Sequence, residues 1–352
     1  MSNKVEFKNV GKSFNGQPAV SNVNFLINDG QLVTLLGPSG CGKTTTLRMV
    51  AGLELPTEGS IFIGDDDVTR VSAAQRSVGM VFQSYALFPH MTVMDNVCYG
   101  LLANKVKKEL AVILATEALD KVGMKQLVAR HPSELSGGQQ QRVAIARSLV
   151  TQPKVLLFDE PLSNLDAKLR RKVRQDIRDL QRDIGVTSVY VTHDQEEALA
   201  ISDEIIVMEQ GRIKQIGTPK ALYNSPNSRF VADFIGDTNI VTCEALKLND
   251  NGTTKLTLEG AEFEHSKRLV AKESYCLSIR PSAIRLFTAN VGNSIKATVL
   301  SSSYLGGHKE YNLRTDAGQE LFVVDHSFDD QLSEGAVVYA TINGLGASVV
   351  DE

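Results

Sequence analysis

The chain has 352 residues, a formal net charge of −4 and a hydrophobic fraction of 42%. This length exceeds one ordinary hydrophobic core and predicts at least two domains, while the lack of any apolar run near the ~18 residues needed to cross a bilayer excludes a membrane-spanning subunit. The weakly acidic balance gives no reason to expect nucleic-acid binding, and four scattered cysteines without metal-ligand spacing are typical of reduced thiols.

The N-terminal residues 1–10 alternate charged and apolar side chains. They lack the hydrophobic region of a secretion signal. We therefore expect a cytoplasmic protein.

A phosphate-binding loop is predicted at residues 37–44, which match the pattern G-x-x-x-x-G-K-[ST]. The pattern requires a strand before it and a helix after it, and residues 31–36 and 44–51 fit these two elements. Backbone N–H groups and the helix N-terminus then favour phosphate oxygens, Lys43 reaches the terminal phosphates, and the Thr44 hydroxyl ligates Mg²⁺. The helix N-terminus is also expected to lower the pKa of the Cys41 thiol and make it reactive. The ATP-binding residues expected here are Gly37, Pro38, Ser39, Gly40, Cys41, Gly42, Lys43, Thr44 and Thr45.

A second glycine-rich element, Leu135-Ser136-Gly137-Gly138-Gln139, opens a predicted helix that runs through Arg147. Ser136 is the expected N-cap, and the glycine pair leaves backbone N–H groups open to an anion. A capped helix with a flexible lead-in describes the same residues. The functional interpretation therefore depends on the motifs that accompany this element.

The apolar run at residues 155–158 predicts a buried strand that ends in Asp159 and Glu160. Ligands of open α/β sheets bind at the carboxyl ends of the strands. We expect Asp159 to hold Mg²⁺ through water, and Glu160 to orient and deprotonate the water that attacks the γ-phosphate. Such a strand end is common alone, but it becomes a specific signal after a phosphate loop.

Residues 167–184 predict an amphipathic helix. Its apolar positions are Leu169, Val173, Ile177, Leu180 and Ile184. Its basic residues Lys168, Arg170, Arg171, Lys172 and Arg174 are accompanied by Asp176, Asp179 and Asp183. We interpret these charges as a solvated face rather than a nucleic-acid patch.

The pattern of elements changes near residue 240. Before it, strands and helices alternate, which predicts an α/β domain with a largely parallel sheet at residues 1–239. After it, short strands separated by turns predict a small all-β domain at residues 240–352, built as one or two small barrels. The strands expected there are residues 255–258, 275–279, 296–300, 320–324 and 337–342.

Over nearly its whole length the chain resembles the ATP-binding subunits of ABC transporters. Six motifs carry the resemblance: the loop 37–44, Gln83 in Val81-Phe82-Gln83, the signature Leu135 to Gln139, Asp159-Glu160, Ser163-Asn164-Leu165-Asp166, and His193 in Val191-Thr192-His193-Asp194. The resemblance implies that Gln83 couples the γ-phosphate and Mg²⁺ to the membrane subunit, that Asp166 lies at a dimer seam, and that His193 contacts the γ-phosphate. It also places Phe14 on the adenine, although a lone phenylalanine or histidine is more often structural. The Asn164 position often carries alanine in the family.

The resemblance further implies an ABC-type P-loop NTPase fold with a helical subdomain at about residues 84–150, followed by an OB-like domain of the TOBE type. Residues 84–97 resemble the importer segment that receives a permease helix, with Tyr85 to Asn96 as the contact region. Residues 230–237 and 279–281 resemble the approach to, and a strand of, the β domain of sugar, polyamine and ferric-iron importers. Gly-Cys-Gly-Lys-Thr-Thr and Phe-Ile-Gly-Asp-Thr-Asn favour the ferric-ion group, which includes members assigned to sugar phosphates.

One phosphate loop and one signature per chain imply a homodimer, because in this family each ATP is held by the loop of one subunit and the signature of the other. In that site Ser136, Gly137, Gly138, Gln139 and Asp166 act in trans. The expected partners are two permease subunits and, indirectly, a solute-binding protein, at the cytoplasmic face of the bacterial inner membrane. Two rival functions remain: a soluble ABC-type ATPase of DNA maintenance, against which the lack of a coiled-coil insertion counts, and a binding-only regulator, against which Glu160 and His193 count.

Overall fold

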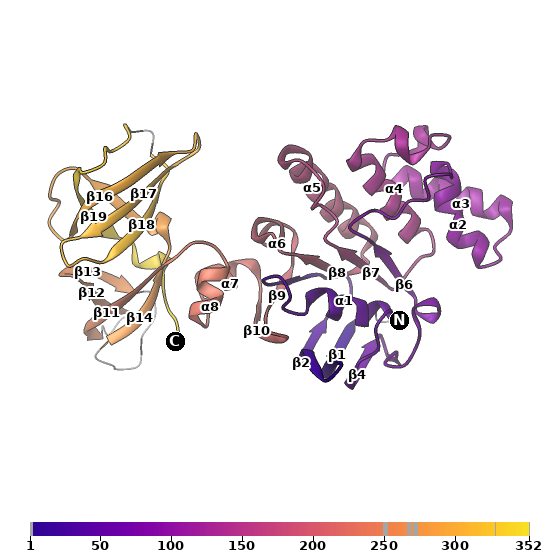
Figure 1. Cartoon of the computed structure of the whole chain (residues 1–352), viewed down its shortest axis with the longest axis horizontal. Coiled ribbons are helices and arrows are strands. Elements are labelled where there is room, and N and C mark those ends of the chain that lie inside the picture. Colours follow the sequence, from indigo (N-terminus) through magenta and orange to yellow (C-terminus); the bar gives the residue numbers. More distant parts are fainter. Residues whose placement is uncertain (1–2, 249–252, 266–268, 270–273, 328, 352) are drawn as a thin grey trace. The chain divides into compact units, whose positions relative to one another are not determined.

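The computed structural model describes residues 3–248, 253–265, 269, 274–327 and 329–351 (Figure 1). The chain divides into two compact units, Met1–Pro219 and Lys220–Glu352. All the residues predicted to bind or hydrolyse ATP lie in the first unit. No helix in the described ranges has the length and apolar character needed to cross a membrane.

The first unit is built around a six-stranded sheet with the order β10-β9-β3-β8-β7-β6. Its strands are β3 (Leu32–Leu36), β6 (Val78–Val81), β7 (Val155–Asp159), β8 (Thr187–Thr192), β9 (Glu204–Glu209) and β10 (Arg212–Gly217). All neighbouring pairs are parallel except β10 with β9. The largely parallel sheet predicted from the sequence is confirmed, and the loops after β7 and β8 meet at one edge.

Alternate residues of the central strands face two different hydrophobic clusters. In β7, Val155 and Leu157 belong to the cluster around α1 (Lys43–Ala51), whereas Leu156 and Phe158 belong to the cluster that contains residues of α4 and α5. Because both faces of the sheet are covered, the central strands β3, β7 and β8 are buried at nearly every position rather than at every second one.

A second, antiparallel sheet of the first unit has the order β2-β1-β4-β5. Its strands are β1 (Val5–Phe14), β2 (Gln17–Ile27), β4 (Glu58–Ile63) and β5 (Asp66–Asp67). Residues of β1, β2, β4 and α1 share one hydrophobic cluster. The buried Arg76 donates to the carbonyls of Met49 and Val50, and thereby satisfies the C-terminal end of α1.

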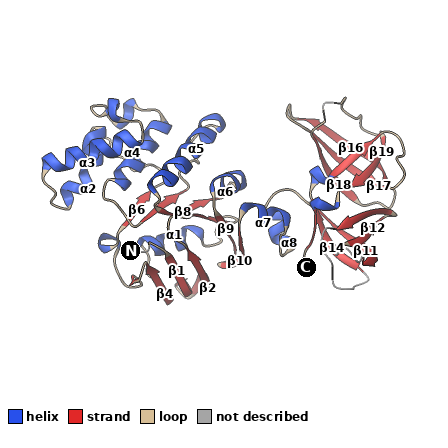
Figure 2. Cartoon of the chain, turned by 180° about the vertical axis from the view of Figure 1, so that it is seen from behind, coloured by secondary structure: helices blue, strands red, loops and turns tan. Residues whose placement is uncertain are grey.

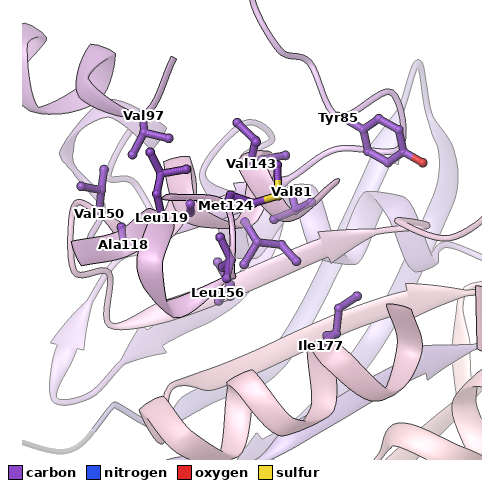
Figure 3. Close-up of a cluster of buried hydrophobic side chains, with 14 of the residues drawn as sticks. Val81, Tyr85, Val97, Ala118, Leu119, Met124, Val143, Val150, Leu156 and Ile177 are labelled. Carbon is purple, nitrogen blue, oxygen red and sulfur yellow. The ribbon is translucent and has the colours of Figure 1, made fainter. Parts of the chain in front are cut away.

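Three helices, α2 (Val93–Ala103), α3 (Lys108–Lys121) and α4 (Gly137–Leu149), are grouped away from β1, β2 and β4 (Figures 1 and 2). Short 3₁₀ turns occur at Ala73–Gln75, Lys125–Leu127 and Pro132–Glu134. Val97, Leu119 and Val143 from the three helices join Val81 and Leu156 of the sheet in one cluster (Figure 3). This cluster fixes the direction of α4 relative to the sheet.

The helix α5 (Ala167–Ile184) has the predicted bounds, and α6 (Gln195–Ile201) follows β8. Val173 and Ile177 of α5 are buried as expected, whereas Ile184 at its end is 36% exposed. The buried Arg178 pairs with Asp203, which also accepts a hydrogen bond from the Leu32 N–H. This pair connects α5 to the start of β3.

The second unit contains α7 (Pro219–Asn224), α8 (Arg229–Phe234) and two five-stranded antiparallel sheets, with the orders β13-β12-β11-β14-β20 and β15-β19-β16-β17-β18 (Figure 2). The strands of the first sheet are β11 (Asn239–Leu248), β12 (Thr254–Leu258), β13 (Ala261–His265), β14 (Ser274–Ile279) and β20 (Ala347–Val349). Those of the second are β15 (Ile284–Phe287), β16 (Ile295–Tyr304), β17 (Lys309–Thr315), β18 (Glu320–Asp325) and β19 (Val337–Ile342). Two 3₁₀ turns, Pro281–Ala283 and Gly344–Gly346, complete the unit. Both sheets contribute to one core, which confirms the all-β C-terminal domain.

Arg280 attaches the segment before β11 to this β domain. Its guanidinium donates to the carbonyls of Tyr223, Ala232, Gly236 and Asp237 and lies 4.2 Å from the Tyr223 ring centroid. Because these contacts join α7 and α8 to the β domain, the boundary between the two compact units lies after Pro219. The sequence instead predicts a change in the pattern of elements near residue 240. The boundary at residues 239 and 240 stays a prediction about where the pattern of elements changes.

Candidate functional site

The phosphate loop connects β3 to α1. Gly40 and Gly42 have φ values of 78° and 103°, which favour glycine, and a Cβ on Gly37 would lie 2.3 Å from the Met208 carbonyl oxygen. Lys43 is 6% exposed, and its ammonium donates to the carbonyls of Gly37 and Pro38 at 2.7 and 2.9 Å. These bonds hold the positive charge within the curl of the loop, where it can meet a phosphate.

The expectation of a reactive Cys41 with a lowered pKa is wrong. Cys41 is 3% exposed, and this burial raises the pKa of its thiol, although the nearby Lys43 ammonium opposes the shift. The thiol packs in the cluster around α1 instead of facing a ligand. Desolvation of the thiolate outweighs the helix N-terminus at this position.

The predicted catalytic residues Glu160 and His193 follow the adjacent strands β7 and β8. The Glu160 N–H donates to the Val191 carbonyl of β8 at 3.0 Å, and its backbone is left-handed with φ 45°. The His193 Nδ1 lies 3.3 Å from Glu160 Oε2. Asp159 precedes this pair, and burial raises the pKa of its carboxyl, with Arg48 opposing and Glu160 reinforcing the shift.

Sequence reasoning missed a polar cluster next to His193. The Glu197 side chain is buried and accepts hydrogen bonds from Thr192 Oγ1 at 2.8 Å and from the Tyr190 hydroxyl at 3.2 Å. Burial raises the pKa of Glu197, and these hydrogen bonds oppose the shift. Asp194 accepts from the Glu197 N–H and so caps α6.

Arg170 belongs to this cluster and corrects the interpretation of the basic residues of α5 as a solvated face. It donates to the Leu165 carbonyl at 3.1 Å and to Asp194 Oδ2 at 3.3 Å. Arg174 donates to the Glu196 carbonyl at 3.2 Å, and Asp176 pairs with Arg142 of α4. These residues connect α5 to neighbouring elements, whereas Lys168, Arg171 and Lys172 are exposed.

Gln83 lies just after β6 and contacts the loop that follows Glu160. Its amide nitrogen donates to Ser163 Oγ at 3.1 Å, and that hydroxyl donates to the Glu160 carbonyl at 3.1 Å. The Asn164 amide donates to the Gln83 carbonyl at 3.1 Å. With its nitrogen engaged by Ser163, Gln83 keeps its amide oxygen for a further ligand.

The residues predicted to hold Mg²⁺ offer suitable ligand atoms: the hydroxyl of Thr44, the amide oxygen of Gln83 and the carboxylate of Asp159. Mg²⁺ prefers such oxygen ligands and is commonly held by one or two protein groups together with substrate phosphates and waters. In the described part of the chain, no group of three or more His, Cys, Asp and Glu side chains is arranged to hold a metal ion. A site completed by nucleotide phosphates is consistent with both observations.

The signature residues open α4 as predicted, with Ser136 at the N-cap and its N–H bonded to Gln139 Oε1 at 2.9 Å. The glycines also have a packing role, because a Cβ on Gly137 would lie 3.0 Å from Leu165 and one on Gly138 would lie 3.2 Å from Leu169. Asp166 caps α5 by accepting from the Leu169 N–H.

A cavity of about 290 Å³ lies beside Ser136 and Gln139. Its other lining residues include Arg142 and Lys172, and none of the described residues that line it belongs to the phosphate loop. Phe14, at the end of β1, is 43% exposed with the Lys12 ammonium 4.8 Å from its ring centroid. The stacking role of Phe14 stays a prediction, as do the site roles carried over from the resemblance.

Comparisons with known proteins match this architecture. The ABC transporter family matches residues 20–163, and the TOBE domain family matches residues 277–344. The Fe(3+) ions import ATP-binding protein FbpC of Agrobacterium fabrum is 51% identical over 99% of this chain and 98% of its own length. The protein of the same name from Vibrio cholerae is 47% identical over 97% of each chain.

Two solved structures resemble the first part of the chain. One is the dimeric ATP-binding cassette MJ0796 in a post-hydrolysis state bound to ADP and Pi, with a TM-score of 0.54 and 33% identity over 61% of this chain and 98% of that one. The other is cbiO1 from Clostridium perfringens, part of the ABC transporter complex cbiONQ, with a TM-score of 0.58 and 28% identity over 62% of this chain and 90% of that one.

Proposed function

Because this chain belongs to the family of ATP-binding proteins of ABC transporters, we propose that it is the ATP-hydrolysing subunit of a bacterial importer of ferric iron. The cargo rests on one observation, the full-length similarity of 47–51% to proteins named for Fe(3+) import. The hydrolytic activity rests on the pairing of Glu160 with His193 at the ends of adjacent parallel strands.

The residues around the γ-phosphate divide the reaction between them. The loop N–H groups and Lys43 bind the β- and γ-phosphates, and a bound Mg²⁺ would offset charge on the phosphate oxygens. Glu160 accepts the proton of the attacking water. His193 holds the Glu160 carboxylate through Nδ1, and its Nε2, on the other side of the ring, can meet the γ-phosphate.

The proposed working unit is a homodimer with two ATP molecules at its seam. Each chain supplies one phosphate loop and one signature. The similarity to a cassette solved as a dimer supports this arrangement. ATP drives the closed state because it binds that state more tightly than the open one.

Two permease subunits are the proposed membrane partners, contacted through residues 85–96, with a solute-binding protein delivering the cargo. The dimer would then lie at the cytoplasmic face of the inner membrane. A DNA-maintenance ATPase is disfavoured, because between the phosphate loop and the signature the longest described helix, α3, has 14 residues and is no coiled coil.

Uptake by the assembled transporter tests this function. The chain, with the permease and binding protein encoded beside it, is reconstituted in vesicles and assayed with radioactive ferric iron, a sugar phosphate, a sugar and a polyamine. We expect ATP-dependent uptake of ferric iron alone and none with Glu160→Gln. Uptake of one of the other compounds would identify that compound as the cargo in place of ferric iron. ATP hydrolysis without uptake of any of the four compounds would contradict the assignment of this chain to an importer.

A further inference from the structure

The turn after Gln83 has an unfavourable backbone conformation. Tyr85 and Ala86 are consecutive and both left-handed, with φ values of 60° and 49°. Residues that carry a Cβ rarely adopt this conformation, and neither position is a glycine or an asparagine. The turn must therefore be held by contacts from outside the segment.

Arg147, in the last turn of α4, supplies such contacts. Its guanidinium donates to the Ala86 carbonyl at 2.7 Å and to the Tyr85 carbonyl at 3.2 Å. It also lies 5.5 Å from the ring centroid of Phe88, whose ring is tilted by 50° to that of Tyr99 at a centroid distance of 4.7 Å. The ion pairs of the described residues include none with Arg147, so its rigid fork serves the two carbonyls of the turn.

The Tyr85 side chain reaches the opposite end of α4. Tyr85 is 6% exposed and lies at the edge of the cluster in Figure 3, with its hydroxyl directed away from the labelled aliphatic side chains. That hydroxyl has no hydrogen-bond partner among the described residues and lies 3.9 Å from the position of a Cβ on Gly137. The turn thus contacts α4 near Ser136 through its side chain and near the C-terminus through Arg147.

We propose that Arg147 couples the permease contact to the ATP site: it locks the Tyr85–Ala86 turn to α4, so that a displacement of residues 85–96 moves the signature residue Ser136. The proposal rests on the proposed function, in which these residues contact the permease. A helix of 13 residues such as α4 spans about 20 Å and transmits displacement as a rigid element.

Arg147→Lys is the first test. It keeps the positive charge but removes the fork that serves both carbonyls, and it alters the cation–π contact with Phe88. We expect ATP affinity and basal hydrolysis of the isolated chain to stay within about twofold, while stimulation by the permease and loaded binding protein falls about tenfold, as for residues that carry coupling between sites. Ser148→Ala is the control for α4, because Ser148 lies next to Arg147 on the same helix and its hydroxyl donates to the Met80 carbonyl without contacting the turn.

Unchanged stimulation in Arg147→Lys would overturn the proposal. An equal loss in Ser148→Ala would overturn it as well, because the effect would then belong to the stability of α4. Thermal unfolding of both variants accompanies the assay to confirm that they are folded.

Ala86→Gly provides a rescue. Glycine adopts the left-handed conformation without steric cost, so the turn needs Arg147 less. The double variant Arg147→Lys, Ala86→Gly is expected to recover part of the lost stimulation, whereas a general packing defect would be unchanged or worsened. Absence of any recovery would contradict a role for Arg147 in holding the turn.

Two further measurements distinguish a failure of the proposed permease contact from a failure of the link inside this chain. A cysteine placed at the exposed His90 should cross-link to the permease, and its failure to do so would contradict the proposed contact but not the link inside this chain. Hydrogen exchange of the isolated chain tests that link alone. Arg147→Lys should speed exchange in residues 84–88 and in the first turn of α4, and faster exchange in the former only would overturn the link.

Discussion

Glu160 combines a left-handed backbone with a carboxylate 3.3 Å from His193, at the edge where β7 and β8 end. Glu160→Gln keeps the shape of this side chain but removes the proton acceptor. We predict normal binding of MgATP and a loss of hydrolysis of about 10²-fold or more, as for a missing general base. Nucleotide affinity and single-turnover hydrolysis are measured together, and a rate near that of the unaltered chain would exclude Glu160 as the base.

Cys41 is predicted to react slowly with alkylating reagents at neutral pH. Burial raises the pKa of its thiol, so the thiolate fraction is smaller than for a free cysteine and grows only as the pH rises beyond the ordinary value of 9.0. Peptide mass analysis over a pH series should show Cys276, which is partly exposed, modified before Cys41. Faster labelling of Cys41 at neutral pH would instead favour a thiolate stabilised by the helix N-terminus.

Glu197 makes folding stability depend on pH. Its pKa is raised by burial above the ordinary 4.5, so its contribution to stability is fully present below 4.5 and is lost as the pH rises through the folded-state value. Glu197→Gln keeps an acceptor for Thr192 but carries no charge to bury. Near neutral pH this variant should therefore unfold at a higher temperature than the unaltered chain, and the difference in unfolding temperature should shrink in acid. The exposed neighbour Glu196, changed to Gln, is the control. A difference that grows in acid would contradict the direction of the shift.

Single residues also mark the limit of sequence reasoning. The residues of the phosphate loop and the Asp159-Glu160 strand end could be predicted, because each has a chemical requirement tied to a fixed spacing. The sequence pattern places Arg170 on a solvated face, because helical spacing alone does not tell a solvent-facing arginine from one that contacts another element. Its partner Asp194 lies 24 positions away and became adjacent only through the pairing of β7 with β8.

At the scale of elements, some strands follow directly from the sequence pattern and others do not. The sequence predicts residues 155–158 as a strand, and β7 spans Val155–Asp159. It did not predict β11, in which Asn239 is buried and exchanges hydrogen bonds with the backbone N–H and carbonyl of Phe322 in β18. The Asn239 side chain bonds to the Phe322 backbone as a neighbouring strand would. A buried polar residue of this kind interrupts the apolar pattern on which strand prediction depends.

The attachment of α7 and α8 to the β domain depends on Arg280, which is 4% exposed. Arg280→Ala leaves the carbonyls of Tyr223, Ala232 and Gly236 without this donor. We predict that it lowers the free energy of unfolding by about 2 kcal/mol, as for buried acceptors left unsatisfied. Denaturant unfolding is compared with the exposed Arg285→Ala, which should change stability by less than about 0.5 kcal/mol. Equal effects would exclude a special role for Arg280.

For the whole molecule, the central claim is that ATP is enclosed between two chains. The nucleotide motifs occur once each, and only the resemblance to a dimeric family could predict from the sequence that the site is shared, because no pattern within one chain reports on its copy. The similarity to a cassette solved as a dimer supports the claim.

Tagged heterodimers that trap nucleotide with a γ-phosphate mimic test this claim most directly. Pairing a Lys43→Ala chain with a Ser136→Arg chain puts both defects into one shared site and leaves the other intact. Pairing a chain that carries both changes with an unaltered chain puts one defect into each shared site. If ATP is bound between the chains, the split pairing traps about one nucleotide per dimer and the double-variant pairing traps almost none, because the charge of Lys43 and the access to the signature are each needed for tight binding. The reverse order, with more nucleotide trapped by the double-variant pairing, would show that each chain encloses its own ATP.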